Sequence, residues 1–379
     1  MAFAAIFAPF PGQPARAQET IATSAKHAFL LDVDSNTVLL NVHGDELMHP
    51  ASMAKLMTME VVFNAIKTGK LSLGDEFVVT EDAWRRGGAT SGGSTMFAKL
   101  NSQIRLEDLI RGVIVQSGND ACIIIAEGMA GTEEVFANVM TQRAREIGLK
   151  KSVFKNATGL PDPEQLVTAR ELAMLARHII EAYPEFYPIY SEPDFEWNKI
   201  RQRNRNPLLS MNIGADGMKT GYTAESGYGL VGSAVQDGRR LIVVVNGLES
   251  ARERATEAQK LLLWGFRAFE EITLFGDGET VGEVGVYGGE KSTVALTGEG
   301  PLKLLIPKGV KRGLKARIVY TGPLAAPVEK GDRVGVLRIY NDDDPISDAP
   351  LYARESVGVG PIHKRALDAA LELVLGVFH

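Results

Sequence analysis

The feature that most constrains this chain is an apolar run, Leu56 to Ile66, that follows directly on the segment Ala51-Ser52-Met53-Ala54-Lys55. The run is apolar on nearly all sides, which predicts a helix over 52–68 that is buried in the core of a globular domain. Pro50 stands before the helix and Gly69 after it, where these residue types favour a helix start and an αL stop. Because Ser52 and Lys55 are three positions apart, their side chains share one face of this helix.

A serine beside a lysine in this position indicates nucleophilic chemistry. A serine hydroxyl becomes a nucleophile when a neighbouring base takes its proton. Lysine can be that base if burial and nearby positive charge keep it neutral. The positive end of the helix macrodipole stabilises an alkoxide and opposes protonation of the lysine. One S-x-x-K pattern is not specific, however, since Ser152-Val153-Phe154-Lys155 has the same form.

Two further motifs make the pattern specific. Ser117-Gly118-Asn119 and Lys219-Thr220-Gly221 follow Ser52 in that order. The three motifs together are typical of penicillin-binding proteins and class A β-lactamases. Two segments imitate the second and third motifs, Ser210-Met211-Asn212 and Lys67-Thr68-Gly69, but the latter is better interpreted as a helix C-terminus.

Composition indicates an exported globular protein. The 379 residues, 45% of them hydrophobic and 23% charged, are enough for two domains. A net charge of −6 gives no reason to expect nucleic acid as a partner. Residues 1–17 are apolar and end in Ala15-Arg16-Ala17, so we expect the remnant of a signal peptide. The single cysteine, Cys122, lies in an apolar helical run and is predicted to be part of the core.

The order of the remaining segments predicts an α/β (α+β) fold. We expect a hairpin over 28–34 and 37–41, helices over 106–116, 120–129, 132–147 and 168–180, strands over 217–222, 227–235 and 239–248, and a helix over 251–269. Segment 70–104 is interpreted as an irregular glycine-rich loop at one rim of the site, and Thr168 with Glu171 as a capping box. The result is a helical layer against an antiparallel sheet.

A second domain is predicted after residue 273. Short β-like runs, 280–287, 292–296, 302–306, 316–320 and 333–340, alternate with glycine and proline turns. The tail 361–379 has an amphipathic helical pattern typical of a membrane-surface anchor, although packing on the β domain or in a dimer seam would give the same pattern. The predicted division is 1–17 signal peptide remnant, 18–273 catalytic domain, 274–360 β-rich domain and 361–379 amphipathic helix. No metal or cofactor is predicted, because the acidic run Asp342-Asp343-Asp344 has no spaced ligand set around it.

With their neighbours, the motifs resemble the low-molecular-mass penicillin-binding proteins, specifically the D-alanyl-D-alanine carboxypeptidases. The resemblance covers essentially the whole mature chain and includes the segments 29–40, 116–122, 198–202, 204–206, 216–221 and 263–266. It implies a penicilloyl-serine transferase domain followed by a β-rich domain that raises it from the membrane. It also implies a location in the periplasm, peripheral on the outer face of the inner membrane.

The resemblance also implies roles for individual residues. Ser52 would attack the carbonyl between the two terminal D-alanines of a peptidoglycan stem peptide, and β-lactam antibiotics would acylate the same serine. Lys55 would be the base, Ser117 and Lys219 would relay a proton to the departing D-alanine, and Asn119 would hold the substrate amide and Lys55. Substrate binding would fall to Thr220, Gly221 and Arg205, with Thr220 and Arg205 on the terminal carboxylate. The backbone N–H groups of Ser52 and Tyr222 would form the oxyanion hole.

Three alternatives differ in what the sequence would need to contain. A class A β-lactamase requires a deacylating glutamate, and Glu171 is interpreted as a helix cap instead. A non-catalytic cell-wall binding or sensor protein would not need the complete polar set. A Ser-His-Asp hydrolase is disfavoured because none of the six histidines lies in a recognisable motif.

Overall fold

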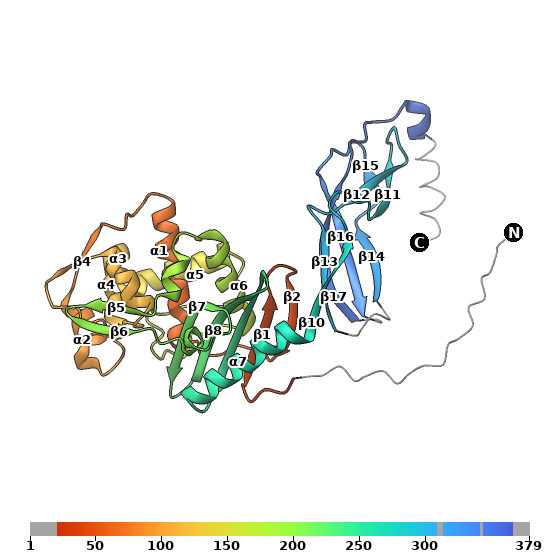
Figure 1. Cartoon of the computed structure of the whole chain (residues 1–379). Helices are drawn as coiled ribbons and strands as arrows, with labels where there is room; N and C mark the ends of the chain where they lie inside the picture. The colour runs from red at the N-terminus through yellow and green to blue at the C-terminus, as the bar shows by residue number, and fades with distance from the viewer. Residues whose placement is uncertain (1–20, 309–313, 342–343, 367–379) are drawn as a thin grey trace, which may run out of the picture.

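The computed structural model describes residues 21–366 apart from 309–313 and 342–343. The predicted signal peptide remnant and most of the predicted tail helix therefore lie outside the described residues. Figure 1 shows a larger part that combines helices with a sheet and a separate β-rich part at its side. None of the helices in the described ranges is long and apolar enough to cross a membrane.

The larger part is built on a five-stranded antiparallel sheet with strand order β2-β1-β9-β8-β7. Its strands are β1 (His27–Asp32), β2 (Thr37–Val42), β7 (Ala215–Thr223), β8 (Gly227–Gln236) and β9 (Arg239–Leu248). The predicted hairpin and the three predicted strands are all present. The strand that carries the Lys-Thr-Gly motif, β7, lies at one edge of the sheet.

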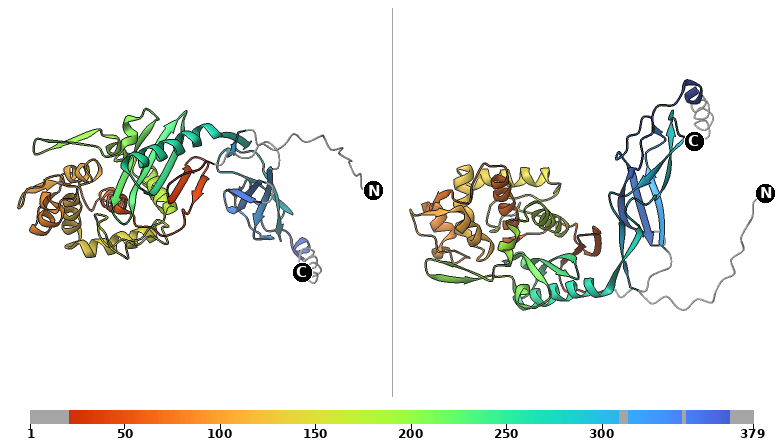
Figure 2. Two further views of the ribbon diagram at one scale, coloured as in Figure 1. Left: turned by 90° about the horizontal axis from the view of Figure 1, so that it is seen from below. Right: turned by 45° about the horizontal axis from the view of Figure 1, so that its top comes forward.

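Both faces of this sheet are covered, which explains the continuous apolar run in β9. Ile242 and Val244 join the core on the side of the helical layer, whereas Val243 and Val245 join the core under α7 (Ala251–Ala268). Successive side chains of a strand point to opposite faces, so a strand buried on both sides is apolar at every position. Figure 2 shows α7 lying across one face of the sheet.

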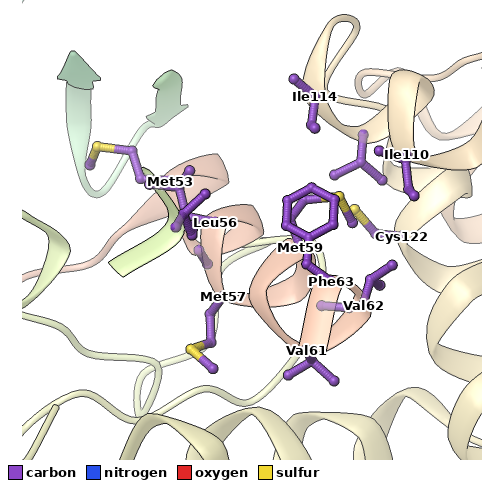
Figure 3. Close-up of a cluster of buried hydrophobic side chains, with 14 of the residues drawn as sticks. Met53, Leu56, Met57, Met59, Val61, Val62, Phe63, Ile110, Ile114 and Cys122 are labelled. Carbon is purple, nitrogen blue, oxygen red and sulfur yellow. The ribbon is translucent and has the colours of Figure 1, made fainter. Parts of the chain in front are cut away.

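The helix that follows the Ser52 segment, α1 (Lys55–Lys67), runs through the middle of the helical layer. Around it lie α3 (Leu106–Ile114), α4 (Asn119–Ala130), α5 (Glu133–Glu146) and α6 (Ala169–Ala182). Figure 3 shows Met59 and Phe63 of α1 near Ile110 of α3 and Cys122 of α4, while Val61 points to the opposite side. Contacts on several sides account for the apolar character of the whole helix, and the core position predicted for Cys122 is confirmed.

The start of this helix differs from the prediction. Residues Ala51–Ala54 form a 3-10 helix, η1, and regular α-helix begins only at Lys55. Side chains three positions apart eclipse one another in a 3-10 turn, so Ser52 in η1 and Lys55 at the C-cap of η1 point to the same side of the chain. The C-terminus is as predicted, because Gly69 has a φ of 72° and its N–H donates to the Ile66 carbonyl at 3.0 Å.

Segment 70–104 is not irregular throughout, so this prediction was wrong in part. It contains β3 (Glu76–Val78), α2 (Glu81–Gly87), the 3-10 turn η2 (Ala89–Ser91) and β4 (Gln103–Arg105). Helix α2 begins at a sequence signal that the glycine content obscured: the Thr80 hydroxyl accepts from the Ala83 N–H at 3.0 Å. A hairpin that was also not predicted, β5 (Asp194–Trp197) and β6 (Ile200–Arg203), precedes η4 (Pro207–Ser210).

The second part is all β, as predicted, with a six-stranded sheet in the order β14-β16-β17-β12-β11-β15. Its strands are β11 (Gly282–Tyr287), β12 (Thr293–Thr297), β14 (Leu314–Tyr320), β15 (Leu324–Ala325), β16 (Arg333–Asn341) and β17 (Asp344–Ala353). β13 (Leu302–Pro307) pairs with β10 (Phe269–Phe275) in a two-stranded ribbon. β10, β15 and β17 were not predicted as strands.

The β10–β13 ribbon is shared between the two parts. Phe269 and Leu305 pack into the core under α7, whereas Ile272, Leu304 and Ile306 pack into the core of the β domain. The predicted boundary at 273/274 falls inside β10. We propose that the boundary lies at the junction of α7 and β10, where Ala268 is followed directly by Phe269.

Candidate active site

Ser52 and Lys55 face each other at the junction of η1 and α1. The Lys55 Nζ atom lies 3.0 Å from the Ser52 Oγ atom. Lys55 is fully buried, whereas Ser52 is half-buried and so remains partly accessible to solvent. This is the side-chain contact between Ser52 and Lys55 that the S-x-x-K spacing predicts.

Two carbonyl oxygens receive the remaining hydrogen bonds of the Lys55 amine. Its Nζ donates to the Asn119 Oδ1 atom at 2.8 Å and to the backbone carbonyl of Thr158. Burial lowers the pKa of Lys55 below its usual value, because an ammonium group without water is costly. The neutral form of Lys55 is therefore easier to reach than that of a lysine in water.

The second motif lies in the turn between α3 and α4. Ser117 is buried and adopts a left-handed conformation with a φ of 65°, and Asn119 opens α4. The neighbouring carboxylate of Asp120 accepts from the Thr95 hydroxyl at 2.6 Å and from the Met96 N–H at 2.9 Å. The Asn119 N–H also donates to the Ser94 carbonyl at 2.7 Å. The segment around 94–98 is thus fastened to the second motif.

The third motif approaches from the edge strand β7. A Cβ atom on Gly221 would lie 2.9 Å from the Pro50 carbonyl oxygen and 3.2 Å from the Ala51 Cβ atom, so β7 packs closely against η1. Lys219 is buried, and burial together with the nearby positive charges of Lys55 and Arg205 lowers the pKa of Lys219 well below its usual value. Its Nζ donates to the Thr220 carbonyl at 3.3 Å.

The end of β7 carries an exposed aromatic ring. Tyr222 is 52% exposed and stacks on Tyr228 of β8 with 4.1 Å between ring centroids. Tyr222 directly follows Gly221, the residue at which β7 packs closely on Pro50 and Ala51. Thr220, by contrast, is buried within the strand.

Two arginines lie near the Lys219 motif. The Arg205 Nε donates to the Gln116 carbonyl at 2.8 Å, which connects it to the turn of the second motif. Arg254 of α7 was not singled out from the sequence. Its Nη1 lies 3.5 Å from the Gly221 carbonyl, its guanidinium lies over the Tyr228 ring, and its buried Nε lacks a hydrogen-bond partner among the described residues. A single arginine in a surface helix carries no sequence signal for such a position.

The Thr158 carbonyl was also not predicted, since it belongs to a loop without a motif. Asn156 organises this loop: its Oδ1 accepts from the Thr158 N–H at 3.2 Å and from the Gly159 N–H at 2.7 Å. Asn-x-x-Gly is a common turn pattern, but nothing in it indicates a contact with Lys55, which lies about a hundred positions away in the sequence.

The serine of Ser152-Val153-Phe154-Lys155, the segment that has the same form as the first motif, has a structural role. Ser152 is buried, and its hydroxyl donates to the Glu171 carboxylate at 2.5 Å. The capping box predicted for Thr168 and Glu171 is only half formed. The Glu171 N–H donates to the Thr168 hydroxyl at 3.1 Å. Its carboxylate turns to Ser152 and to the Lys151 N–H instead.

These features define a class of protein. The fold is an antiparallel sheet with helices on both faces. The site combines a serine and a buried lysine at the start of the central helix with a Ser-x-Asn turn and a Lys-Thr-Gly edge strand. This combination is typical of serine acyl-enzyme hydrolases of the penicillin-binding kind. The chain belongs to the D-alanyl-D-alanine carboxypeptidase family, whose profile matches residues 13–250. Residues 269–359 match the C-terminal domain of penicillin-binding protein 5.

Individual relatives agree with this assignment. D-alanyl-D-alanine carboxypeptidase DacC of Escherichia coli is 42% identical over 370 residues, which are 97% of this chain and 92% of the relative. The crystal structure of penicillin-binding protein 5 from Haemophilus influenzae is 40% identical, with a TM-score of 0.79, and the match covers 89% of this chain and 99% of that one. Penicillin-binding protein D2 from Listeria monocytogenes, solved in an ampicillin-bound form, is 27% identical with a TM-score of 0.59 and covers 66% of this chain and 100% of that one. The predicted fold and the predicted function, a serine-type D-Ala-D-Ala carboxypeptidase, are confirmed.

Proposed function

We propose that Ser52 is the nucleophile and Lys55 the general base of this carboxypeptidase. The observation that carries the proposal is the hydrogen bonding of the Lys55 amine. A neutral amine has two N–H groups and one lone pair. Its contacts with Asn119 Oδ1 and the Thr158 carbonyl use both N–H groups. The lone pair is then directed at the third neighbour, the Ser52 hydroxyl at 3.0 Å.

In the proposed reaction, Ser52 Oγ attacks the carbonyl carbon between the two terminal D-alanines of a stem peptide while its proton passes to Lys55. The oxyanion that forms accepts from the backbone N–H groups of Ser52 and Tyr222. Ser117 and Lys219 then carry a proton to the nitrogen of the departing D-alanine. Water cleaves the resulting ester and restores Ser52.

The substrate's free carboxylate is proposed to bind at Thr220 and Arg205. Gly221, which follows Thr220 in β7, is proposed to line the same binding site. A planar guanidinium suits a carboxylate, and Arg254 adds positive charge next to Gly221. Because a carboxypeptidase must recognise a chain end, a concentration of cations beside the nucleophile is the expected arrangement. Asn119 is proposed to hold the substrate amide in addition to Lys55.

We also propose that the enzyme acts in the periplasm on peptidoglycan, and that β-lactams acylate Ser52. The support is the ampicillin-bound relative, the cleavage pattern before residue 18, and the D-alanyl-D-alanine substrate that the family name denotes. Attachment of the tail 361–379 to the outer face of the inner membrane rests on its amphipathic sequence pattern alone.

Mass spectrometry after brief incubation with a penicillin tests the assignment of the nucleophile. One adduct per chain is expected on the peptide that contains Ser52, and none in Ser52→Ala. In parallel, the wild-type enzyme should release D-alanine from a peptide ending in D-Ala-D-Ala, and Ser52→Ala should not. An adduct on the variant would disprove the assignment. Rapid loss of the wild-type adduct would indicate a β-lactamase, and an adduct without peptide cleavage would indicate a binding or sensor protein.

A further inference from the structure

Glu133 is a buried carboxylate for which the proposed reaction has no use. It is the first residue of α5 and only 7% exposed. Its Oε1 atom accepts from the Ala157 N–H at 3.0 Å, and its Oε2 atom accepts from the Arg86 Nη2 atom of α2 at 2.7 Å. A carboxylate is buried in this way only where partners replace the lost water.

The bond to Ala157 connects Glu133 with the base of the reaction. Ala157 directly precedes Thr158, whose carbonyl accepts from Lys55. Asn156 braces the other side of the same turn through the Gly159 N–H. A displacement of Glu133 would therefore move the carbonyl that orients the Lys55 amine.

Glu133 also contributes negative charge close to Lys55. The titratable and charged groups that face Lys55 are Cys122 and Asp120 on α4, Glu133 on α5, Arg205 after β6, and Lys219 on β7. Burial raises the pKa of Cys122 to about 12, so this thiol is neutral in the working range of the enzyme. The two carboxylates remain, and within the described part of the chain Glu133 is the one of the two that has an arginine, the partly exposed Arg86, as its counter-ion.

We propose that Glu133 is a positioning residue for Lys55: it holds the Ala157–Thr158 turn against the amine and places a buried negative charge behind it, which Arg86 partly offsets. The inference rests on the proposed role of Lys55 as general base. Arg86 lies near the surface of α2, so this contact series connects that helix with the reacting groups.

The test measures the rate constant for acylation by a fluorescent penicillin as a function of pH. Glu133→Gln keeps an acceptor for the Ala157 N–H but removes the charge, so the rise of the rate with pH should move to lower pH. Arg86→Gln leaves the carboxylate without its counter-ion, so the rise should move to higher pH. Glu134→Gln is the matched control: it removes the same charge from the next, exposed position of α5 and should leave the profile unchanged.

Glu133→Ala separates position from charge. It removes the acceptor as well, so the alkaline plateau of the acylation rate should fall roughly 10- to 100-fold, whereas the plateau of Glu133→Gln stays near that of the wild type. Thermal unfolding of each variant gives the folded fraction to which its rates are normalised. If Glu133→Ala does not fold, the opposite pH shifts expected of Glu133→Gln and Arg86→Gln still test the role of Glu133.

Two outcomes overturn the inference. A wild-type pH profile in Glu133→Gln, or shifts of the same sign in Glu133→Gln and Arg86→Gln, would reduce Glu133 to a structural residue whatever its effect on stability. Failure of the wild type to be labelled would instead remove the proposed function itself. The two failures are therefore distinguishable.

Discussion

Gly159 packs directly against the peptide group of Ala51: a Cβ atom on Gly159 would lie 2.0 Å from the Ala51 carbonyl oxygen and 2.9 Å from the Ser52 nitrogen. Gly159 also has a φ of 81°, which side chains strongly disfavour. The loop that presents the Thr158 carbonyl and the turn that presents Ser52 are thus fitted backbone to backbone.

Gly159→Ala should therefore damage the site more than the fold. We expect the acylation rate to fall about 100-fold, because the nucleophile and the Thr158 carbonyl must separate, and stability to fall by about 1–3 kcal/mol. Fluorescent-penicillin labelling and thermal unfolding measure the two effects. Gly148→Ala is the control, since Gly148 has a φ of 91° but open space around its Cβ position; it should lose about 1 kcal/mol of stability and keep the wild-type rate. Equal labelling rates in both variants would contradict the close packing.

Acylation should depend on a deprotonated lysine. Burial lowers the pKa of Lys55, and burial with neighbouring cations lowers the pKa of Lys219. Lys55, the proposed base, is neutral above its pKa, so the rate should rise as pH increases through the apparent pKa of this coupled pair and then level off. Lys55→Arg should stay nearly inactive at every pH, because a guanidinium does not deprotonate in this range. Lys67→Arg, at the exposed end of the same helix, should behave as the wild type. A rate that is flat from mildly acidic to alkaline pH would refute the mechanism.

Arg205 should distinguish a free chain end from a blocked one. If its guanidinium receives the substrate carboxylate, Arg205→Ala should lose roughly 1.5–3 kcal/mol of transition-state stabilisation with a free-acid peptide and far less with the corresponding amide. The comparison of kcat/KM for the two peptides is the measurement. Arg205→Lys keeps the charge but loses the planar guanidinium, so its kcat/KM for the free-acid peptide should lie between those of the wild type and Arg205→Ala. Because Arg205 also holds the Gln116 carbonyl, equal losses on acid and amide would assign it to positioning the Ser117 turn instead.

Ser152→Ala separates the two S-x-x-K segments. Its penicillin labelling should equal that of the wild type, because the hydrogen bonds of Ser152 among the described residues go to Glu171 and Arg145 and not to the site. Stability should fall by about 1–3 kcal/mol, since the buried Glu171 carboxylate loses a hydrogen-bond donor. Ser52→Ala should show the reverse, a normal unfolding temperature without labelling. Reduced labelling of correctly folded Ser152→Ala would mean that the two segments are coupled.

The sequence was sufficient for the three motifs and the layer arrangement, because their signals are local. Ser52, Asn119 and Lys219 each lie in a short pattern, and the apolar periods of α1 and β9 reflect burial directly. The Thr158 carbonyl and Glu133 could not be predicted in the same way. Every residue has a backbone carbonyl, so no residue type in the sequence marks the one that contacts Lys55. Glu133 has the sequence pattern of an ordinary acid in the first turn of a helix, and its contact with Ala157 arises only in the folded protein.

Missed elements have physical reasons as well. Helix α2 was not predicted because the glycines that follow it indicated a loop more strongly than the Thr80 N-cap indicated a helix. Strand β17 begins in an acidic segment and contains Pro345 and Pro350, residues that usually exclude a central strand. β16 pairs with it along almost its full length nevertheless, so tertiary pairing outweighs local preference there.

The ribbon of β10 and β13 has a consequence for how such proteins can be cut or recombined. A fragment that ended at Ala268 would remove Phe269 from its edge-to-face contact with Trp264, whose ring lies 5.0 Å away, and would also lose Leu305 from the core under α7. Apolar surface would then be open to water, which favours aggregation. Exchange of the β-rich half between relatives would succeed only where the incoming piece supplies matching side chains at both positions. Selection should therefore keep the two halves together as one inherited unit.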